Sequence, residues 1–233
     1  MSGLSEEEQL DNFKSFSKKY GSAIVTIILI ALIAFFGWQY WQKKNKAESQ
    51  NRTAKVQQLM DSAAAAESDE QALNNLYLSA NDIIKEAPNS VQAVQTELLL
   101  AKIAYDKQDY AKAEKSLKKI ENSELNDEGL LQIVKLRLAY AQMAQNKYDE
   151  ALNTLSAVKD PAFKATADEA RGDVYVAKKD VAAAQKAYKS AWDQLVEMKK
   201  ERQILQIKLE SVGVLVEDPD LERPILATQV DES

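Results

Sequence analysis

The chain has 233 residues, of which 45% are hydrophobic and 28% charged, with a net charge of −6, and this composition predicts one helical domain with additional segments. It contains no cysteine and no histidine, which excludes disulfide frameworks, thiolate or imidazole metal sites and Ser-His-Asp triads. The six glycines are too scattered to form a phosphate-binding loop, so we expect no catalytic, metal-binding or cofactor-binding residue and no enzyme activity. The acidic balance also argues against nucleic acid as a partner, because a phosphate backbone would be repelled.

The first feature along the chain is an uncharged stretch from Tyr20 to Gln42. Its centre, Ile24–Phe36, holds ten residues that are Ile, Leu, Val or Phe. A helix over this stretch would rise roughly 30 Å, the thickness of a bilayer core. We therefore predict a transmembrane helix over residues 21–42, preceded by a short tail over residues 1–20.

A cleaved signal peptide is the alternative to a permanent anchor. Trp38, Tyr40 and Trp41 follow the apolar run, however, where a cleavage site would require small residues. Aromatic residues at this place are typical of a membrane interface, so we expect the anchor to stay attached.

Basic residues flank the predicted span on both sides. Three lysines precede it, and five basic residues follow it: Lys43, Lys44, Lys46, Arg52 and Lys55. These counts favour a cytoplasmic C-terminal domain by the positive-inside rule, but the margin is small and leaves the topology open. The cluster after the span also fits lysines that contact anionic lipid headgroups.

Beyond the span, apolar periodicity predicts helices of ten to fifteen residues separated by turns, and a residue pattern recurs three times. One of its columns, Tyr110, Tyr148 and Val181, repeats after 38 and then 33 residues, close to the tetratricopeptide period of about 34. Small residues such as Ala101 and Gly172 would let the two helices of a repeat approach closely. We predict a tetratricopeptide-like repeat domain over residues 43–216; an alanine-rich bundle without repeats is the alternative.

Two helices complete this prediction. An incomplete repeat, with a helix from Leu73 to Ala87, comes first, and a closing helix from Arg202 to Val212 covers the open end of the stack. Residues 217–233 contain six acidic residues and two prolines and predict a disordered acidic tail. The expected fold class is all-α: a single N-terminal transmembrane helix, then a tetratricopeptide-repeat α-solenoid with a C-terminal closing helix.

Repeat arrays of this kind bind peptides or partner helices on the concave face, which is lined by the first helix of each repeat. The repeat register places nine residues on that face: Leu98, Lys102, Tyr105, Leu136, Tyr140, Met143, Glu169, Asp173 and Val176. The middle of this predicted site is apolar and its last part is acidic, which disfavours capture of a C-terminal carboxylate. The alternative is that the closing helix folds back into the groove and that these residues are core.

The whole arrangement resembles the YfgM-like family of bacterial inner-membrane proteins, the ancillary subunit of the SecYEG translocon. Five segments carry the resemblance: Gln9–Lys14, Gly37–Trp41, Leu136–Ala139, Ala170–Asp173 and Leu205–Leu209. The resemblance implies a cytoplasmic tail, a single span in the inner membrane and a repeat domain in the periplasm. It also implies association with the translocon and with a membrane-anchored periplasmic chaperone of the prolyl-isomerase type, where the protein would assist exported chains.

Two hypotheses follow. The first is a membrane-anchored interaction protein in periplasmic protein export and folding. The alternative, motivated by the basic residues after the span, is a cytoplasm-facing repeat adaptor that recruits a regulator or assembly factor to the membrane.

Overall fold

The computed structural model describes residues 6–66, 69–200, 202–217 and 219, and all regular structure among them is helical. The chain divides into two compact units, Met1–Lys55 and Val56–Ser233. The helices are α1 (Glu6–Ala65), α2 (Glu70–Glu86), α3 (Val91–Asp106), α4 (Tyr110–Ile120), α5 (Glu128–Ala144), α6 (Tyr148–Ser156), α7 (Pro161–Ala177), α8 (Val181–Glu197) and α9 (Gln203–Ser211).

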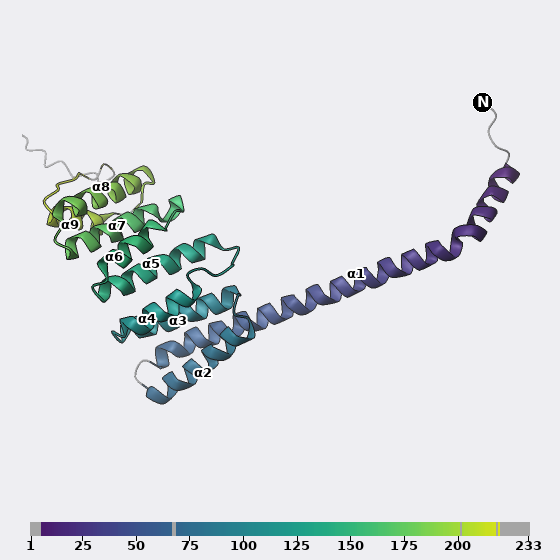
Figure 1. Cartoon of the computed structure of the whole chain (residues 1–233), viewed down its shortest axis with the longest axis horizontal. Helices are drawn as coiled ribbons and strands as arrows, with labels where there is room; N and C mark the ends of the chain where they lie inside the picture. Colours follow the sequence, from purple (N-terminus) through teal and green to yellow (C-terminus); the bar gives the residue numbers. More distant parts are fainter. Residues whose placement is uncertain (1–5, 67–68, 201, 218, 220–233) are drawn as a thin grey trace, which may run out of the picture. The chain divides into compact units, whose positions relative to one another are not determined.

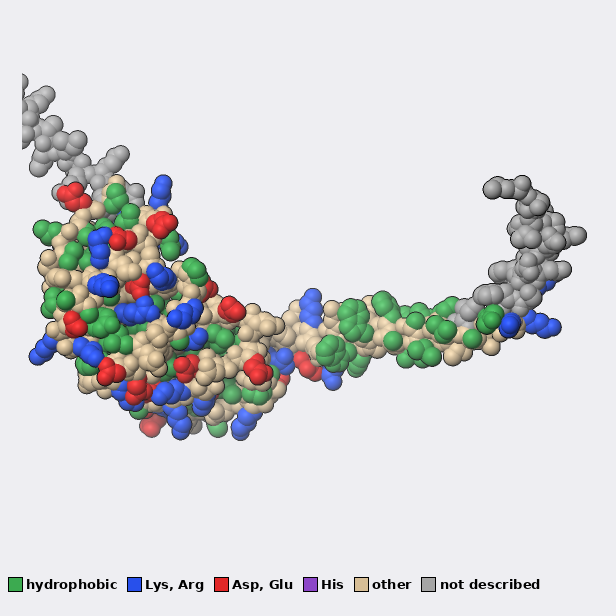
Figure 2. Space-filling model, turned by 45° about the horizontal axis from the view of Figure 1, so that its top comes forward, with side chains coloured by type: hydrophobic (Ala, Val, Ile, Leu, Met, Phe, Trp, Pro, Cys, Tyr) green, Lys and Arg blue, Asp and Glu red, His purple; other side chains and the backbone are tan. Residues whose placement is uncertain are grey.

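The first unit is part of α1 and carries the apolar stretch. Within the described residues, α1 is the one helix long and apolar enough to cross a membrane, with a mean hydropathy of 2.3 in its most apolar window and none of that window buried. Ile27, Ile33 and Phe36 are 66%, 72% and 59% exposed, and Figure 2 shows the apolar side chains of this segment with basic side chains at each end. Large side chains exposed all round a helix require an apolar surrounding, so the predicted N-terminal membrane helix is confirmed as a candidate span.

The second unit is a stack of antiparallel helix pairs that follow one another in chain order (Figure 1). The first pair consists of the end of α1 and α2, because Val56 and Leu59 share a buried cluster with Leu76 and Ile83. The sequence predicts only the second helix of this pair. The structure supplies the first one from the end of α1, so the repeat unit starts at Val56 with a complete pair.

The turns inside the later pairs have the same geometry at the same register. Gln108, Asn146 and Lys179 each adopt a positive φ, of 62°, 61° and 61°, two positions before the first residue of α4, α6 and α8. The residue after each one donates its backbone N–H to a carbonyl in the preceding helix at 2.8, 3.0 and 2.9 Å. This left-handed turn satisfies carbonyls at a helix C-terminus. Its recurrence at the predicted intervals supports the predicted repeat register.

Aspartates cap the N-termini of many of the helices. Asp109 and Asp180 accept backbone N–H bonds at 3.0 Å from residues in the first turn of α4 and α8, and Asp127 does the same for α5 at 2.9 Å. Such caps satisfy N–H groups that have no partner inside the helix.

Close helix contact depends on small residues, as predicted. A Cβ atom at Gly172 would lie 2.2 Å from two carbons of the Tyr188 ring, so α7 and α8 touch at this point. Ala101 and Ala139 occupy the same register position in α3 and α5, and both are buried. The three positions therefore serve packing between the two helices of a pair.

The last helix, α9, occupies the range predicted for the closing helix. Leu205 and Leu209 are buried in a cluster with Tyr188 and Trp192 of α8. The end of the stack is thus covered, as such arrays require. The predicted tail, residues 217–233, lies outside the described residues except for Glu217 and Pro219.

Candidate protein-binding groove

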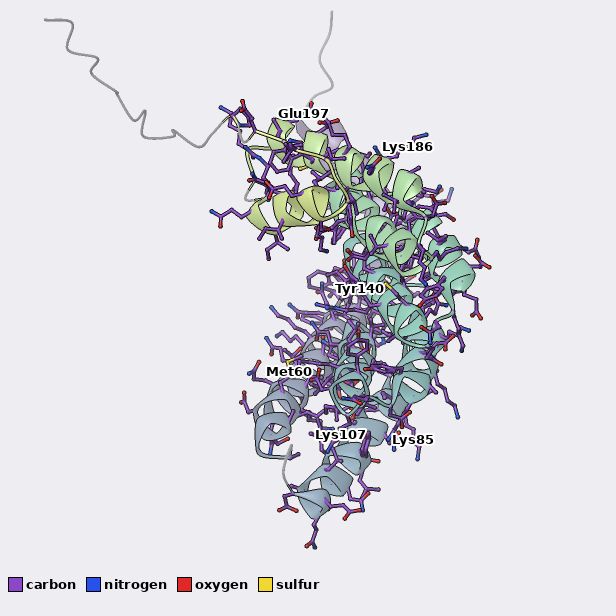
Figure 3. The ribbon with its side chains drawn as sticks, turned by 90° about the vertical axis from the view of Figure 1, so that its left-hand side faces the viewer. Met60, Lys85, Lys107, Tyr140, Lys186 and Glu197 are labelled. Carbon is purple, nitrogen blue, oxygen red and sulfur yellow. The ribbon has the colours of Figure 1, made fainter. Side chains whose placement is uncertain are left out.

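An open groove lies between the end of α1, α3 and α5. Its volume is about 720 Å³, and its walls are mostly apolar. The lining residues are Met60, Gln95, Leu98, Leu99, Ala101, Lys102, Tyr105, Asp106, Ala113, Leu117, Ile133, Arg137 and Tyr140. A second hollow of about 490 Å³ shares Met60, Leu99, Lys102 and Asp106 with it, so the two are adjacent. Figure 3 shows Met60 on the same side of the stack as α9, with Lys85 and Lys186 on the opposite side.

Four of the nine predicted contact residues line this groove: Leu98, Lys102 and Tyr105 of α3, and Tyr140 of α5. The Tyr105 ring is held by an edge-on contact with Tyr110 of α4, with ring centroids 5.0 Å apart. Burial raises the pKa of both Tyr105 and Tyr140. Both hydroxyls are therefore neutral at physiological pH and can donate hydrogen bonds to a bound segment.

Three predicted residues lie elsewhere. Leu136 is 7% exposed and belongs to the core cluster shared by α5, α6 and α7, and Met143 packs against the same cluster. Val176 is exposed near the end of α7 but does not line the groove.

The acidic part of the predicted site is bound within the chain. Lys208 of α9 places its Nζ 2.7 Å from Glu169 Oε1 and 2.8 Å from Asp173 Oδ1, both on α7. Asp173 also accepts a 2.8 Å hydrogen bond from the Tyr188 hydroxyl. Burial alone would lower the pKa of Lys208, but the hydrogen bonds to Asp173 and Glu169 outweigh it and raise the pKa. The closing helix thus folds onto the concave side of α7, which is the predicted alternative for this part of the face.

The sequence register misses Met60, Ile133 and Arg137 in the groove wall. Ile133 and Arg137 lie one turn apart on α5, beside the stripe that the register selects. Met60 lies within the predicted repeat domain, 43–216, but the sequence predicts no packed helix before Leu73. The spacing of Val56, Leu59 and Ala63 on α1 is the signal for a further packed helix, because it places three apolar residues on one face.

A buried ionic cluster holds the helices around the groove. Glu114 of α4 has a side chain only 6% exposed, and its carboxylate lies 2.7 Å from the ammonium groups of both Lys118 and Lys147. Gln145, which follows α5, donates to the same carboxylate at 2.8 Å and to the Tyr110 carbonyl at 3.1 Å. Burial opposes ionisation of Glu114, but these hydrogen bonds prevail and lower its pKa to about 2. The cluster therefore ties α4 to the turn between α5 and α6.

Comparisons with known proteins agree with this architecture. The family model of the tetratricopeptide repeat-like domain matches residues 14–214. A relative in Haemophilus influenzae is 30% identical over 90% of this chain and 98% of its own length, and one in Neisseria gonorrhoeae is 27% identical over the same shares. A relative in Escherichia coli K12 is 26% identical over 81% of this chain and 85% of its own length. All three are named ancillary SecYEG translocon subunit.

No solved structure matches the chain. The family match nevertheless covers the apolar helix and all the helix pairs, and the relatives align over nearly their whole lengths. The chain therefore belongs to the tetratricopeptide repeat-like family of ancillary SecYEG translocon subunits.

Proposed function

We propose that this protein is a non-enzymatic interaction subunit of the SecYEG translocon that binds partner or client segments in the groove of its repeat unit. The observation that carries the proposal is the groove itself, in which side chains from α1, α3 and α5 line one open hollow. The names of the relatives support the translocon as the assembly. The family and the apolar helix fit a single-pass inner-membrane protein.

The side chains of the groove suit contact with varied apolar segments. Met60 is 39% exposed and Ile133 is 36% exposed, so both present apolar surface to solvent. Methionine adapts to different shapes, and tyrosine offers a large apolar ring with a polar end, so both are favoured where one surface meets several partners. A groove with Met60, Leu98 and Tyr140 in its walls can therefore take side chains from an extended or helical segment.

We place the repeat unit in the periplasm and residues 1–20 in the cytoplasm, as the family resemblance implies. In that position, the groove would meet chains that emerge from the translocon. The resemblance also implies a second partner, a membrane-anchored periplasmic chaperone of the prolyl-isomerase type. A protein held beside both could assist the folding of exported proteins.

Lipid headgroups form a further contact in this proposal. Trp38, Tyr40 and Trp41 are 58%, 71% and 61% exposed on α1. Exposed lysines follow within one to two turns at positions 43, 44 and 46. Aromatic rings prefer the membrane interface and lysines prefer anionic headgroups, so this segment would fix the depth of the helix.

The basic cluster also favours a second candidate function, a cytoplasm-facing adaptor that recruits a regulator or assembly factor. Protease treatment of spheroplasts separates the two. A periplasmic repeat unit is cut by protease added outside, whereas a cytoplasmic unit is cut only after lysis.

The groove is tested by photo-crosslinking of the full-length protein in its native membrane. A photoreactive residue at Tyr140 is compared with one at Lys186, which is exposed on the opposite side of the stack (Figure 3). The proposal predicts adducts with translocon subunits, the chaperone or exported chains at position 140 and few at position 186. Equal adducts at both positions would remove the groove from the mechanism.

A further inference from the structure

Charge divides the concave side into two parts. The acidic part on α7, Glu169 and Asp173, is bound by the single ammonium group of Lys208, at 2.7 to 2.9 Å, which offsets one of its two negative charges. A basic partner segment would have to displace this lysine, and Leu205 and Leu209 hold α9 in place beside it. Both carboxylates of the acidic pair are therefore engaged by Lys208 while α9 is bound.

The open part carries the opposite charge. The two adjacent hollows are lined by three basic side chains, Lys102, Lys107 and Arg137, and by one carboxylate, Asp106. Lys102 forms an ion pair with Asp106 at 2.5 Å. The groove is thus locally positive on a chain whose net charge is −6.

Arg137 is the cation that remains for a ligand. Within the part of the chain that the structure describes, no carboxylate lies in ion-pair contact with Arg137. Arg137 lines the groove together with Tyr105 and Tyr140. Burial raises the pKa of both tyrosines, and the charge of Arg137 opposes this rise; at Tyr140 the carboxylates of Asp173 and Glu169 raise the pKa further. The exposed guanidinium lies in the same wall as two phenol groups and apolar side chains, where it can form charge-assisted hydrogen bonds with a ligand carboxylate.

We propose that the groove selects apolar segments that carry an acidic side chain, with the carboxylate paired to Arg137, and that it disfavours segments with a basic side chain at that position. The proposal rests on the proposed function, because it defines the chemistry of the segment that the groove takes. The apolar side chains of the segment would contact Met60, Leu98 and Ile133 in the groove wall. The ion pair would set the register and the choice of partner, as charges at interfaces commonly do.

The test uses the full-length protein in nanodiscs of phosphatidylcholine, whose headgroup has no net charge. Three fluorescent peptides share one amphipathic sequence and differ only in a central Glu, Gln or Lys, and their affinities are measured by anisotropy against empty nanodiscs. We expect the Glu peptide to bind about fivefold more tightly than the Gln peptide, and the Lys peptide to bind more weakly than both. Added salt should reduce these differences.

Substitutions assign the effect to Arg137. Arg137→Gln should remove the difference between the Glu and Gln peptides, whereas Arg137→Lys should keep part of it. Lys186→Gln is the matched control, because it removes one positive charge from the opposite side of the stack (Figure 3) and should leave the preference unchanged.

The outcomes separate this proposal from the proposed function. If all three peptides bind equally and Tyr140→Ala weakens each of them, the groove is a binding site but its charge preference is refuted. If Tyr140→Ala changes none of the affinities, binding occurs elsewhere, and both the groove and its preference are refuted. Tighter binding of the Lys peptide would show that the acidic pair on α7 opens to partners, and it would overturn the proposal.

Discussion

The ionic cluster around Glu114 should contribute measurably to the stability of the repeat unit. Glu114→Gln keeps the size of the side chain and one hydrogen-bond acceptor but removes the negative charge between Lys118 and Lys147. Two ammonium groups would then face a neutral amide in a site that is 6% exposed. We expect the variant to fold and to be less stable than the wild type.

The size of the loss follows from the pKa of the carboxyl group. The pKa of Glu114 falls from its usual 4.5 to about 2 in the folded chain. At 1.36 kcal/mol for each pKa unit, this shift corresponds to about 3 kcal/mol of stabilisation of the folded state. Lys118 and Lys147 are 49% and 39% exposed, so water screens part of this interaction. We therefore expect the free energy of unfolding to fall by about 2 kcal/mol at pH 7.

The sign of the pH dependence follows from the same shift. A lowered pKa means that the folded state favours the carboxylate, so the stabilisation is complete above pH 4.5 and is lost as the pH falls from 4.5 toward 2. Urea unfolding of the full-length protein in detergent, followed by circular dichroism, measures this stability at several pH values. Glu124→Gln, at an exposed position between α4 and α5, is the control. A difference between wild type and Glu114→Gln that stays constant from pH 7 to pH 3 would refute the electrostatic account.

Three further predictions follow. Gly172→Leu should destabilise the repeat unit by roughly 1 to 3 kcal/mol and lower its melting temperature, because any Cβ atom at this position meets the Tyr188 ring. An unchanged melting temperature would show that α7 and α8 can move apart at this point without loss of stability. Lys179→Gly should raise the free energy of unfolding by up to about 1 kcal/mol, because glycine removes the steric conflict of the Cβ atom at a φ of 61°. Asn146→Gly should raise it less, because asparagine tolerates this conformation. An equal or larger increase for Asn146→Gly in urea unfolding would contradict this explanation. Replacement of Ile24–Phe36 by an unrelated apolar span should reduce co-purification with the translocon if the anchor contacts a partner helix; unchanged recovery would assign the contact to the repeat unit alone.

Local chemistry made the fold predictable from the sequence. Each helix of a pair shows its apolar stripe within a few turns, and aspartates such as Asp109 and Asp180 mark where the second helices begin. Tyr110, Tyr148 and Val181 start α4, α6 and α8, so the column read from the sequence is the first residue of each second helix. A register based on helix starts is reliable, because the capping residue and the apolar stripe both indicate the same first residue of the helix.

The site was less predictable because its residues meet only in the folded chain. Lys208 pairs with residues 39 and 35 positions earlier, and nothing in the local pattern shows that one ammonium group bridges Glu169 and Asp173. The repeat register places Leu136 on the concave face, but Leu136 is buried, because a register gives only the side of a helix and the side of α5 next to the groove also packs on α7. Arg137, one position further, lines the groove instead. A step of one residue turns a helix by about 100°, which is the limit of what a register alone can resolve.

The start of the repeat unit shows why a domain boundary cannot be read from composition. The sequence predicts that the repeat domain begins at residue 43, directly after the span, yet α1 continues from the span to Ala65. From Val56 onward, its apolar residues pack on α2, and Met60 enters the groove wall. The same helix therefore carries the membrane span and one wall of the proposed binding site.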